Sequence, residues 1–169
     1  ANRQRLIDDP RNKLYKSYVK VVSIVKPKFF VMENVKGMKS VASQVVEDFE
    51  KIGYSVSYRL LNAKNFGVPQ NRERLIYIGN RLGKNNDEIF NKIEEYSKNI
   101  SEYVLADAIN DLKPLKASRK KNSTELDSET SGKKIDSKFS NDLNEYVLFI
   151  NQGKNYPLVF NHKARYNND

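Results

Sequence analysis

Apolar residues recur at helical spacing in two segments near the start of the chain. Between residues 12 and 26 they fall three or four positions apart, and Pro27 follows, which predicts an amphipathic helix that ends at the proline. The same spacing from Val41 to Ile52 predicts a second helix, and Gly53 stands where a helix-terminating glycine is expected. Asp48 is a polar position on the otherwise apolar face of this second helix.

Two short apolar runs and one segment of alternating apolar residues predict β-strands in the same part of the chain. They are Phe29–Met32, Val56–Leu61 and Leu75–Ile78. The first run has no polar alternation, so we expect it to be buried on both faces. Strand, helix and strand in succession are typical of a crossover unit with parallel strands. The pattern therefore predicts an α/β fold with a parallel sheet flanked by helices.

The pattern weakens toward the C-terminus. Helices are predicted at 87–96 and 104–112, whereas 113–138 is rich in Lys, Ser, Thr, Asp and Glu and resembles a polar loop or linker of the kind found in disordered segments. Beyond it, Tyr146–Ile150 predicts a short strand or helix and Leu158–Phe160 a strand. The chain of 169 residues is long enough for one domain, with its core before the linker.

Composition narrows the functional classes. The net charge of +9 favours polyanionic partners such as nucleic acid or an anionic membrane surface. No apolar run approaches the roughly 20 residues that cross a bilayer, and no signal-type segment opens the chain, so we expect a cytoplasmic protein without a membrane span. The chain contains no cysteine, which excludes disulfides, thiolate metal sites and cysteine nucleophiles within it. His162, the single histidine, has no partner cluster for a metal.

Polar residues gather at the ends of two predicted strands. Glu33 and Asn34 follow the first strand, at the edge where ligands bind in parallel α/β sheets. Arg72 and Arg74 precede the third strand at alternate positions, so they point to one side while Glu73 faces away. Each group also has an ordinary explanation, because Glu33 can be a solvated loop residue and the arginines a surface ion-pair network.

Two motifs carry a resemblance to a known family. ENVKG at 33–37 and PQNRERLIYIG at 69–79 resemble the Glu-Asn-Val and Gln-x-Arg-x-Arg motifs of the DNA cytosine-5 methyltransferases, in the same order and at a similar separation. The resemblance extends over residues 1–80 and is weaker at 104–112 and 161–169. It implies part of a Rossmann-like methyltransferase fold that uses S-adenosylmethionine.

The resemblance also implies roles for the polar residues. In the family, a cytosine is flipped out of duplex DNA and methylated at C5. A glutamate at the Glu33 position would bind the N3 and N4 edge of the base in a water-poor pocket, and an arginine at the Arg74 position would hold O2. Arg72 would lie beside Arg74, toward the nucleophile loop or the DNA backbone. Three further residues are expected to support the pocket: Asn34, Pro69 and Gln70.

Basic residues and domain boundaries complete this interpretation. Arg3, Arg5 and Arg11 are candidates for contacts with DNA phosphates. Lysines and Arg119 in the polar segment could do the same, or could belong to a solvated loop. We expect three regions, namely the second half of a methyltransferase catalytic domain at 1–112, a polar linker at 113–138 and the start of a target-recognition region at 139–169.

The sequence also departs from the family pattern. The Pro-Cys motif with the nucleophile and the glycine-rich cofactor turn are both missing. We therefore expect an internal piece of a longer methyltransferase of the bacterial restriction-modification type, inactive alone, with most of the S-adenosylmethionine site elsewhere. The alternative is a non-catalytic DNA-binding module or partner subunit on the same fold. An unrelated nucleotide-binding α/β domain would need a glycine-rich phosphate loop, which this sequence lacks.

Overall fold

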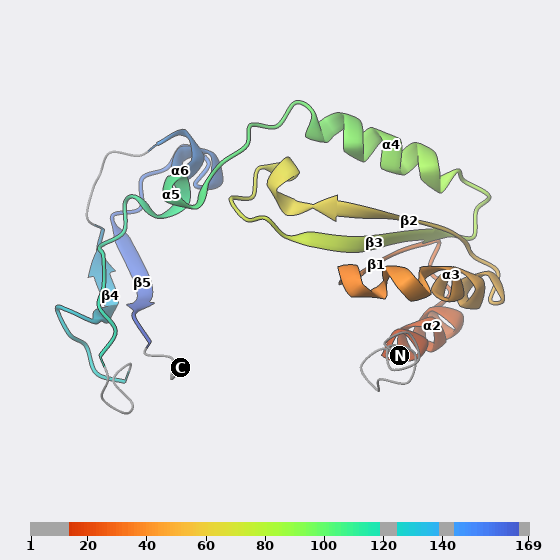
Figure 1. The fold of residues 1–169 in the computed structure, drawn as a ribbon, viewed down its shortest axis with the longest axis horizontal. Helices are drawn as coiled ribbons and strands as arrows, with labels where there is room; N and C mark the ends of the chain where they lie inside the picture. Colours follow the sequence, from red (N-terminus) through yellow and green to blue (C-terminus); the bar gives the residue numbers. More distant parts are fainter. Residues whose placement is uncertain (1–13, 119–124, 139–143, 166–169) are drawn as a thin grey trace. The chain divides into compact units, whose positions relative to one another are not determined.

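The chain divides into two compact units. The computed structural model describes residues 14–118, 125–138 and 144–165, and its units are 1–102 and 103–169 (Figure 1). The division falls after Glu102, whereas the sequence placed it after Leu112. Helix α5 (Leu105–Ile109) explains the difference, because the Asp107 carbonyl accepts a hydrogen bond from Asn144 Nδ2 at 2.7 Å, inside the second unit.

The first unit contains a three-stranded sheet of β1 (Phe29–Val35), β2 (Ser55–Asn62) and β3 (Glu73–Asn80). The strand order is β1-β3-β2, and β3 is antiparallel to both neighbours. β1 and β2 therefore run in the same direction, as the crossover pattern predicts, but they are not adjacent. The expected parallel sheet is wrong, because the chain turns back after β2 and inserts β3 between the two strands.

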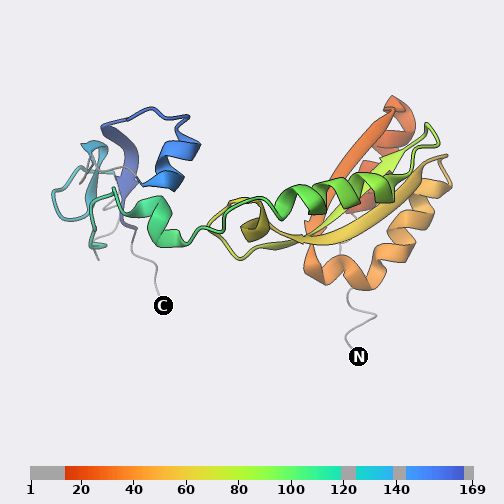
Figure 2. The same cartoon turned by 90° about the horizontal axis from the view of Figure 1, so that it is seen from above.

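Helices cover both faces of this sheet. Helices α2 (Leu14–Val25) and α3 (Ala42–Glu50) lie on one face and α4 (Asn86–Ser97) on the other, as Figure 1 and the view from above in Figure 2 show. The structure confirms all three as predicted helices. Two short 3₁₀ helices, Lys36–Val41 and Ala63–Phe66, lie in the connections that follow β1 and β2.

An aromatic cluster forms the centre of the first unit. The Phe30 ring stacks on Phe49 with centroids 4.3 Å apart and meets Tyr54 edge-on at 5.4 Å. These side chains belong to the α2–α3 face of the sheet. On the opposite face of β1, Phe29 and Val31 are 44% and 63% exposed, so the predicted burial of this strand on both faces is wrong. The reason is that α4 packs on β2 and β3 and leaves β1 uncovered.

The second unit contains α5, β4 (Gly132–Ser137), α6 (Glu145–Ile150) and β5 (Leu158–Lys163). β4 and β5 form an antiparallel pair in which Ile135 is opposite Phe160. A strand thus lies in the segment that the sequence indicated as a linker, and Tyr146–Ile150 forms a helix rather than a strand. None of the helices in the described part of the chain is long and apolar enough to span a bilayer.

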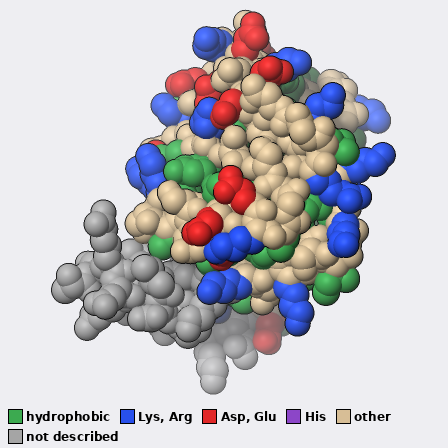
Figure 3. All heavy atoms as spheres, turned by 90° about the vertical axis from the view of Figure 1, so that its right-hand side faces the viewer, with side chains coloured by type: hydrophobic (Ala, Val, Ile, Leu, Met, Phe, Trp, Pro, Cys, Tyr) green, Lys and Arg blue, Asp and Glu red, His purple; other side chains and the backbone are tan. Residues whose placement is uncertain are grey.

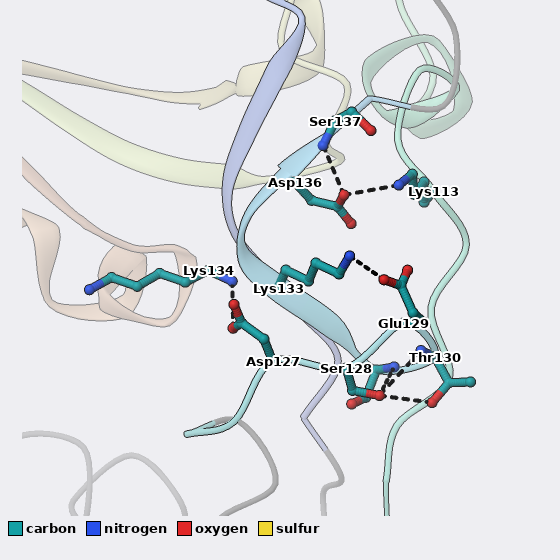
Figure 4. A network of polar contacts seen from close by, with 10 residues as sticks. Lys113, Asp127, Ser128, Glu129, Thr130, Lys133, Lys134, Asp136 and Ser137 are labelled. Atoms are coloured by element: carbon teal, nitrogen blue, oxygen red, sulfur yellow. Dashed lines mark hydrogen bonds and ion pairs between the residues drawn. The ribbon is translucent and has the colours of Figure 1, made fainter.

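Polar contacts link β4 to the residues around it in the second unit. Figure 4 shows Lys113 paired with Asp136 at 2.9 Å and Lys133 paired with Glu129. The hydrogen bond from Lys113 holds the pKa of Asp136 below its usual value. Charged residues that look like a solvated linker in the sequence therefore find specific partners in the fold.

Candidate functional site

The candidate site lies where β1 ends and β3 begins. In the antiparallel register Glu33 is opposite Ile76 and Val35 is opposite Arg74. Glu33 and Arg74 are thus diagonal neighbours, and strand alternation places both side chains on the sheet face that carries α4. Arg74 Nε lies 2.5 Å from Glu33 Oε1. The structure therefore brings together two residues that are far apart in the sequence.

The ion pair between these two residues is partly open to solvent. The Glu33 side chain is 51% exposed and that of Arg74 is 25% exposed. Although Nε is close to the carboxylate, it makes no aligned hydrogen bond, whereas Arg74 Nη1 donates to the Glu73 carbonyl at 2.9 Å. A pair this exposed contributes no more than about 1 kcal/mol to stability. The water-poor surroundings expected for Glu33 are not present here, because β1 is an edge strand whose α4-side face is uncovered.

A cavity of about 470 Å³ opens beside this pair. Two arginines and one glutamate supply its charge, and aliphatic side chains and one aromatic ring supply its walls. Its lining consists of Glu33, Leu61, Ala63, Phe66, Arg72, Arg74, Ile76 and Ile93. Apolar walls with a few convergent polar groups are typical of a small-molecule or nucleobase site.

The alternation predicted for the Gln-x-Arg-x-Arg segment is visible in the structure. Arg72 and Arg74 both line the cavity. Glu73 points elsewhere and pairs with Lys36 Nζ at 2.6 Å. The cavity therefore carries an excess of positive charge, which suits a ligand with acceptor atoms or developing negative charge.

The structure does not place the expected support residues in the cavity lining. Asn34 lies on the other face of β1, and its Oδ1 accepts a hydrogen bond from the Val35 amide at 2.9 Å. Pro69 and Gln70 are in the connection before β3, where the Gln70 amide donates to the Val68 carbonyl at 2.7 Å. Neither lines the cavity.

The other residues singled out from the sequence belong to other segments of the chain. Arg3, Arg5 and Arg11 are outside the described residues. His162 is in β5 of the second unit, opposite Lys133. In the described ranges, no three acidic or histidine side chains come together in a way that could hold a metal ion. On the face drawn in Figure 3, lysine and arginine side chains are interspersed with acidic ones.

The sequence interpretation missed Asn62, Phe66 and Ile93. Asn62 ends β2 and accepts hydrogen bonds from the backbone of the next connection. An asparagine directly before a helical turn is a capping signal that could have been noticed. Phe66 stands in the segment that resembles the family, but Ile93 comes from α4, and nothing in the local sequence places it beside Arg74.

The fold and the cavity define a mixed α/β protein with a basic, partly apolar site at the end of an antiparallel sheet. Sequence comparison identifies the class. The family model of C-5 cytosine-specific DNA methylases matches residues 1–167, so the chain belongs to that family. Members of this family use S-adenosylmethionine and act on DNA.

Individual relatives agree with the family assignment. The chain is 47% identical over 81 residues to the type II methyltransferase M1.HphI of Haemophilus parahaemolyticus, a match that covers 45% of this chain and 22% of the relative. It is 41% identical over 120 residues to M.FnuDI of Fusobacterium nucleatum, covering 67% of this chain and 34% of the relative. The chain thus spans about a third or less of the length of these two relatives.

A solved structure supports the fold. It is described as a DNA modification methyltransferase encoded within an E. coli prophage, and it matches with a TM-score of 0.57. The match covers 83% of this chain and 39% of the other at 21% identity. At that level of identity the likeness concerns the fold alone.

Proposed function

We propose that this chain is the segment of a DNA cytosine-5 methyltransferase that forms the pocket for the target cytosine, in an enzyme of the type II restriction-modification class. The observation that carries the proposal is the pairing of Glu33 with Arg74 at 2.5 Å beside a cavity of about 470 Å³. Family membership supports the reaction, and this geometry supports the proposed location of the base.

The cavity has groups suited to each part of a flipped pyrimidine. The Glu33 carboxyl group can face N3 and the exocyclic N4 amine, and the Arg74 guanidinium can donate to O2. Because addition at C6 of the ring moves negative charge toward O2 and N3, a fixed cation at Arg74 stabilises the transition state more than the ground state. The Glu33–Arg74 pair must open, at a cost of no more than about 1 kcal/mol for a pair this exposed.

Arg72 and the apolar walls would complete the binding of the base. Arg72 adds a second positive charge to the cavity lining, where it can meet either the base or a phosphate of the DNA backbone. Phe66 and Ile93 offer apolar surface to a planar ring. Apolar walls also exclude water around the charged groups once the base is bound, which strengthens their electrostatic effect.

The residues that line this cavity do not fit the cofactor. S-adenosylmethionine supplies the methyl group in this family, and its sulfonium is a cation. The cavity places two arginines against one glutamate, a balance that disfavours a second cation. We therefore assign no cofactor site to this cavity and propose that the cofactor binds to other parts of the full enzyme.

The chain by itself is expected to be inactive. It contains no cysteine, and the family reaction requires a cysteine thiolate to attack the base. The proposed pocket therefore works only together with a nucleophile from the rest of a methyltransferase. Methyl transfer by the isolated chain, measured with labelled S-adenosylmethionine and duplex DNA, would contradict this part of the proposal.

The decisive experiment substitutes the two paired residues in the full enzyme. We expect Glu33→Gln and Arg74→Ala each to lower turnover at saturating cofactor at least about tenfold, equivalent to about 1.4 kcal/mol of transition-state stabilisation. Glu73→Gln is the matched control, because Glu73 is also ion-paired, to Lys36, but does not line the cavity.

The control separates a pocket effect from a general loss of stability. Glu73→Gln should retain turnover within about twofold while losing a comparable surface ion pair. If all three variants turned over at the same near-normal rate, Glu33 and Arg74 would have no part in the chemistry, and the proposed pocket would be wrong.

A further inference from the structure

The Asn62 side chain makes hydrogen bonds at both ends of the connection between β2 and β3. This connection contributes residues to the cavity lining. Asn62 is the last residue of β2, and the connection from Ala63 to Arg72 leads into β3. Asn62 Oδ1 accepts hydrogen bonds from the Lys64 amide at 3.2 Å and from the Arg72 amide at 3.0 Å. A single oxygen thus joins the first turn of the connection to its last residue.

Two further contacts close the same connection. Asn62 Nδ2 donates to Asn71 Oδ1 at 2.6 Å, and the Ala63 amide donates to the Arg72 carbonyl at 3.0 Å. Inside this closed loop, Asn62 caps the 3₁₀ helix Ala63–Phe66, which ends at Gly67 with φ of 76°. The left-handed conformation at Gly67 reverses the chain so that both ends can meet Asn62.

Residues near both ends of this loop line the cavity. Ala63 and Phe66 line it from the 3₁₀ helix, and Arg72 lines it from the end of the connection. Asn62 itself does not line the cavity, so it has no direct contact to offer a ligand there. Its influence on the site must act through the backbone positions of the residues that it binds.

We propose that Asn62 is a positioning residue for the cytosine pocket, one that fixes the Arg72 backbone and the Phe66 wall relative to each other. The inference rests on the proposed function for its link to methylation. The hydrogen bonds of Asn62 to Lys64, Asn71 and Arg72, which we call the clamp, are a property of this chain. A guanidinium on a loosely held backbone is spread over many positions, and a misplacement of about 1 Å can cost about a hundredfold in rate.

Hydrogen exchange tests the clamp without any enzymatic activity. In the 169-residue chain, Asn62→Ala should speed exchange of the Arg72 and Lys64 amides at least about tenfold, because each loses its Asn62 acceptor. Asn85→Ala is the matched control, since Asn85 caps α4 by accepting from the Asp87 amide at 2.9 Å and does not line the cavity. It should speed exchange at Asp87 and leave Arg72 unchanged.

A conservative variant tests whether the accepting oxygen of Asn62 is sufficient, without the rest of its side-chain amide. Asn62→Asp keeps oxygens that can accept from both backbone amides, and the Asn71 amide can turn to donate to the new carboxylate. Exchange at Arg72 should therefore return to within about threefold of the original rate. Rates at Arg72 that are equal in the original chain and in Asn62→Ala would overturn the clamp.

A double-mutant cycle in the full enzyme tests the positioning role. Asn62→Ala should lower turnover at least about tenfold, Asn62→Asp should restore most of it, and Asn62→Ala should have little further effect in an Arg72→Ala background. Losses that simply multiply would show that Asn62 does not act through Arg72. If Arg72→Ala and Arg74→Ala both left turnover intact, the proposed pocket would fail, while hydrogen exchange would still decide whether the clamp exists.

Discussion

Asp48 shows how one half-buried carboxylate is accommodated on an apolar helix face. Its Oδ2 accepts a hydrogen bond from Tyr15 Oη at 3.1 Å, and its Oδ1 accepts from Gln44 at 3.0 Å and Lys51 at 3.3 Å. Burial raises the pKa of Asp48, but these hydrogen bonds outweigh burial and leave the pKa below its usual value. The polar position predicted within the second helix therefore joins α3 to α2.

The lowered pKa of Asp48 predicts how stability depends on pH. Because the folded state favours the ionised form, the contribution of Asp48 is complete well above the unfolded pKa of about 3.9 and is lost as the pH falls through the folded pKa. We expect Asp48→Asn to lower the free energy of unfolding by about 1–3 kcal/mol at pH 7 and by less at pH 3. Urea unfolding at the two pH values measures the difference.

Tyr15 supplies the control for this experiment. Burial, and then the hydrogen bond to Asp48, raise the pKa of Tyr15 to about 12, so this phenol stays protonated throughout the acid range. Tyr15→Phe removes a donor but no acidic group from the pair. The contribution of Asp48 should still fall with pH in that variant, although by less, and an equal effect of Asp48→Asn at pH 7 and pH 3 would contradict the linkage.

At the scale of elements, the packing of β1 on β3 depends on one glycine. Gly79 is opposite Phe30 in the register, and a Cβ atom at this position would collide with the Phe30 ring. The ring cannot turn aside, because it is stacked on Phe49 and is 5% exposed. This close approach explains a glycine within a β-strand where no turn is present.

Gly79→Ala should therefore destabilise the first unit by about 1–3 kcal/mol through overpacking. Gly37→Ala is the matched control, since a Cβ atom there meets nothing within 4 Å and the residue is exposed. Denaturant midpoints of the two variants give the comparison. A Gly79→Ala chain as stable as the Gly37→Ala chain would show that the aromatic cluster can rearrange.

Helices and strands could be predicted from the sequence where the pattern of apolar residues is local. The periodicity around Val22 and Val45 places two helices on the sheet, and both valines are buried as that pattern requires. The uncovered face of β1 was not predictable, because an unbroken apolar run such as Phe29–Met32 does not tell which neighbour covers it. That depends on where α4 packs.

At the scale of the whole molecule, the two units differ in the contacts that they bury. The first has an aromatic and aliphatic core around Phe49 and Tyr77. The second includes a largely buried ion pair, in which Lys138 Nζ lies 2.5 Å from Asp111 Oδ2 with side chains 11% and 3% exposed. Removing one member of such a pair leaves an uncompensated charge in a poorly hydrated place.

This difference predicts unequal responses to one substitution. Asp111→Ala should destabilise the second unit by about 3–5 kcal/mol. Hydrogen exchange by mass spectrometry should then show loss of protection in 125–138 and 144–165 while β1, β2 and β3 stay protected. Equal loss of protection in both units would show that the chain unfolds as one cooperative body.

The sequence by itself determined the family, the principal helices and strands, and the two polar motifs, because periodicity and motif order are properties of neighbouring residues. Tertiary structure decided which strands are adjacent, which face of β1 is covered, and which side chains meet at the cavity. Glu33 meets Arg74, and Ile93 joins them, only because β3 returns antiparallel between β1 and β2 and α4 packs over that face. Such contacts depend on how segments that are distant in the sequence pack together, and local sequence patterns do not specify that packing.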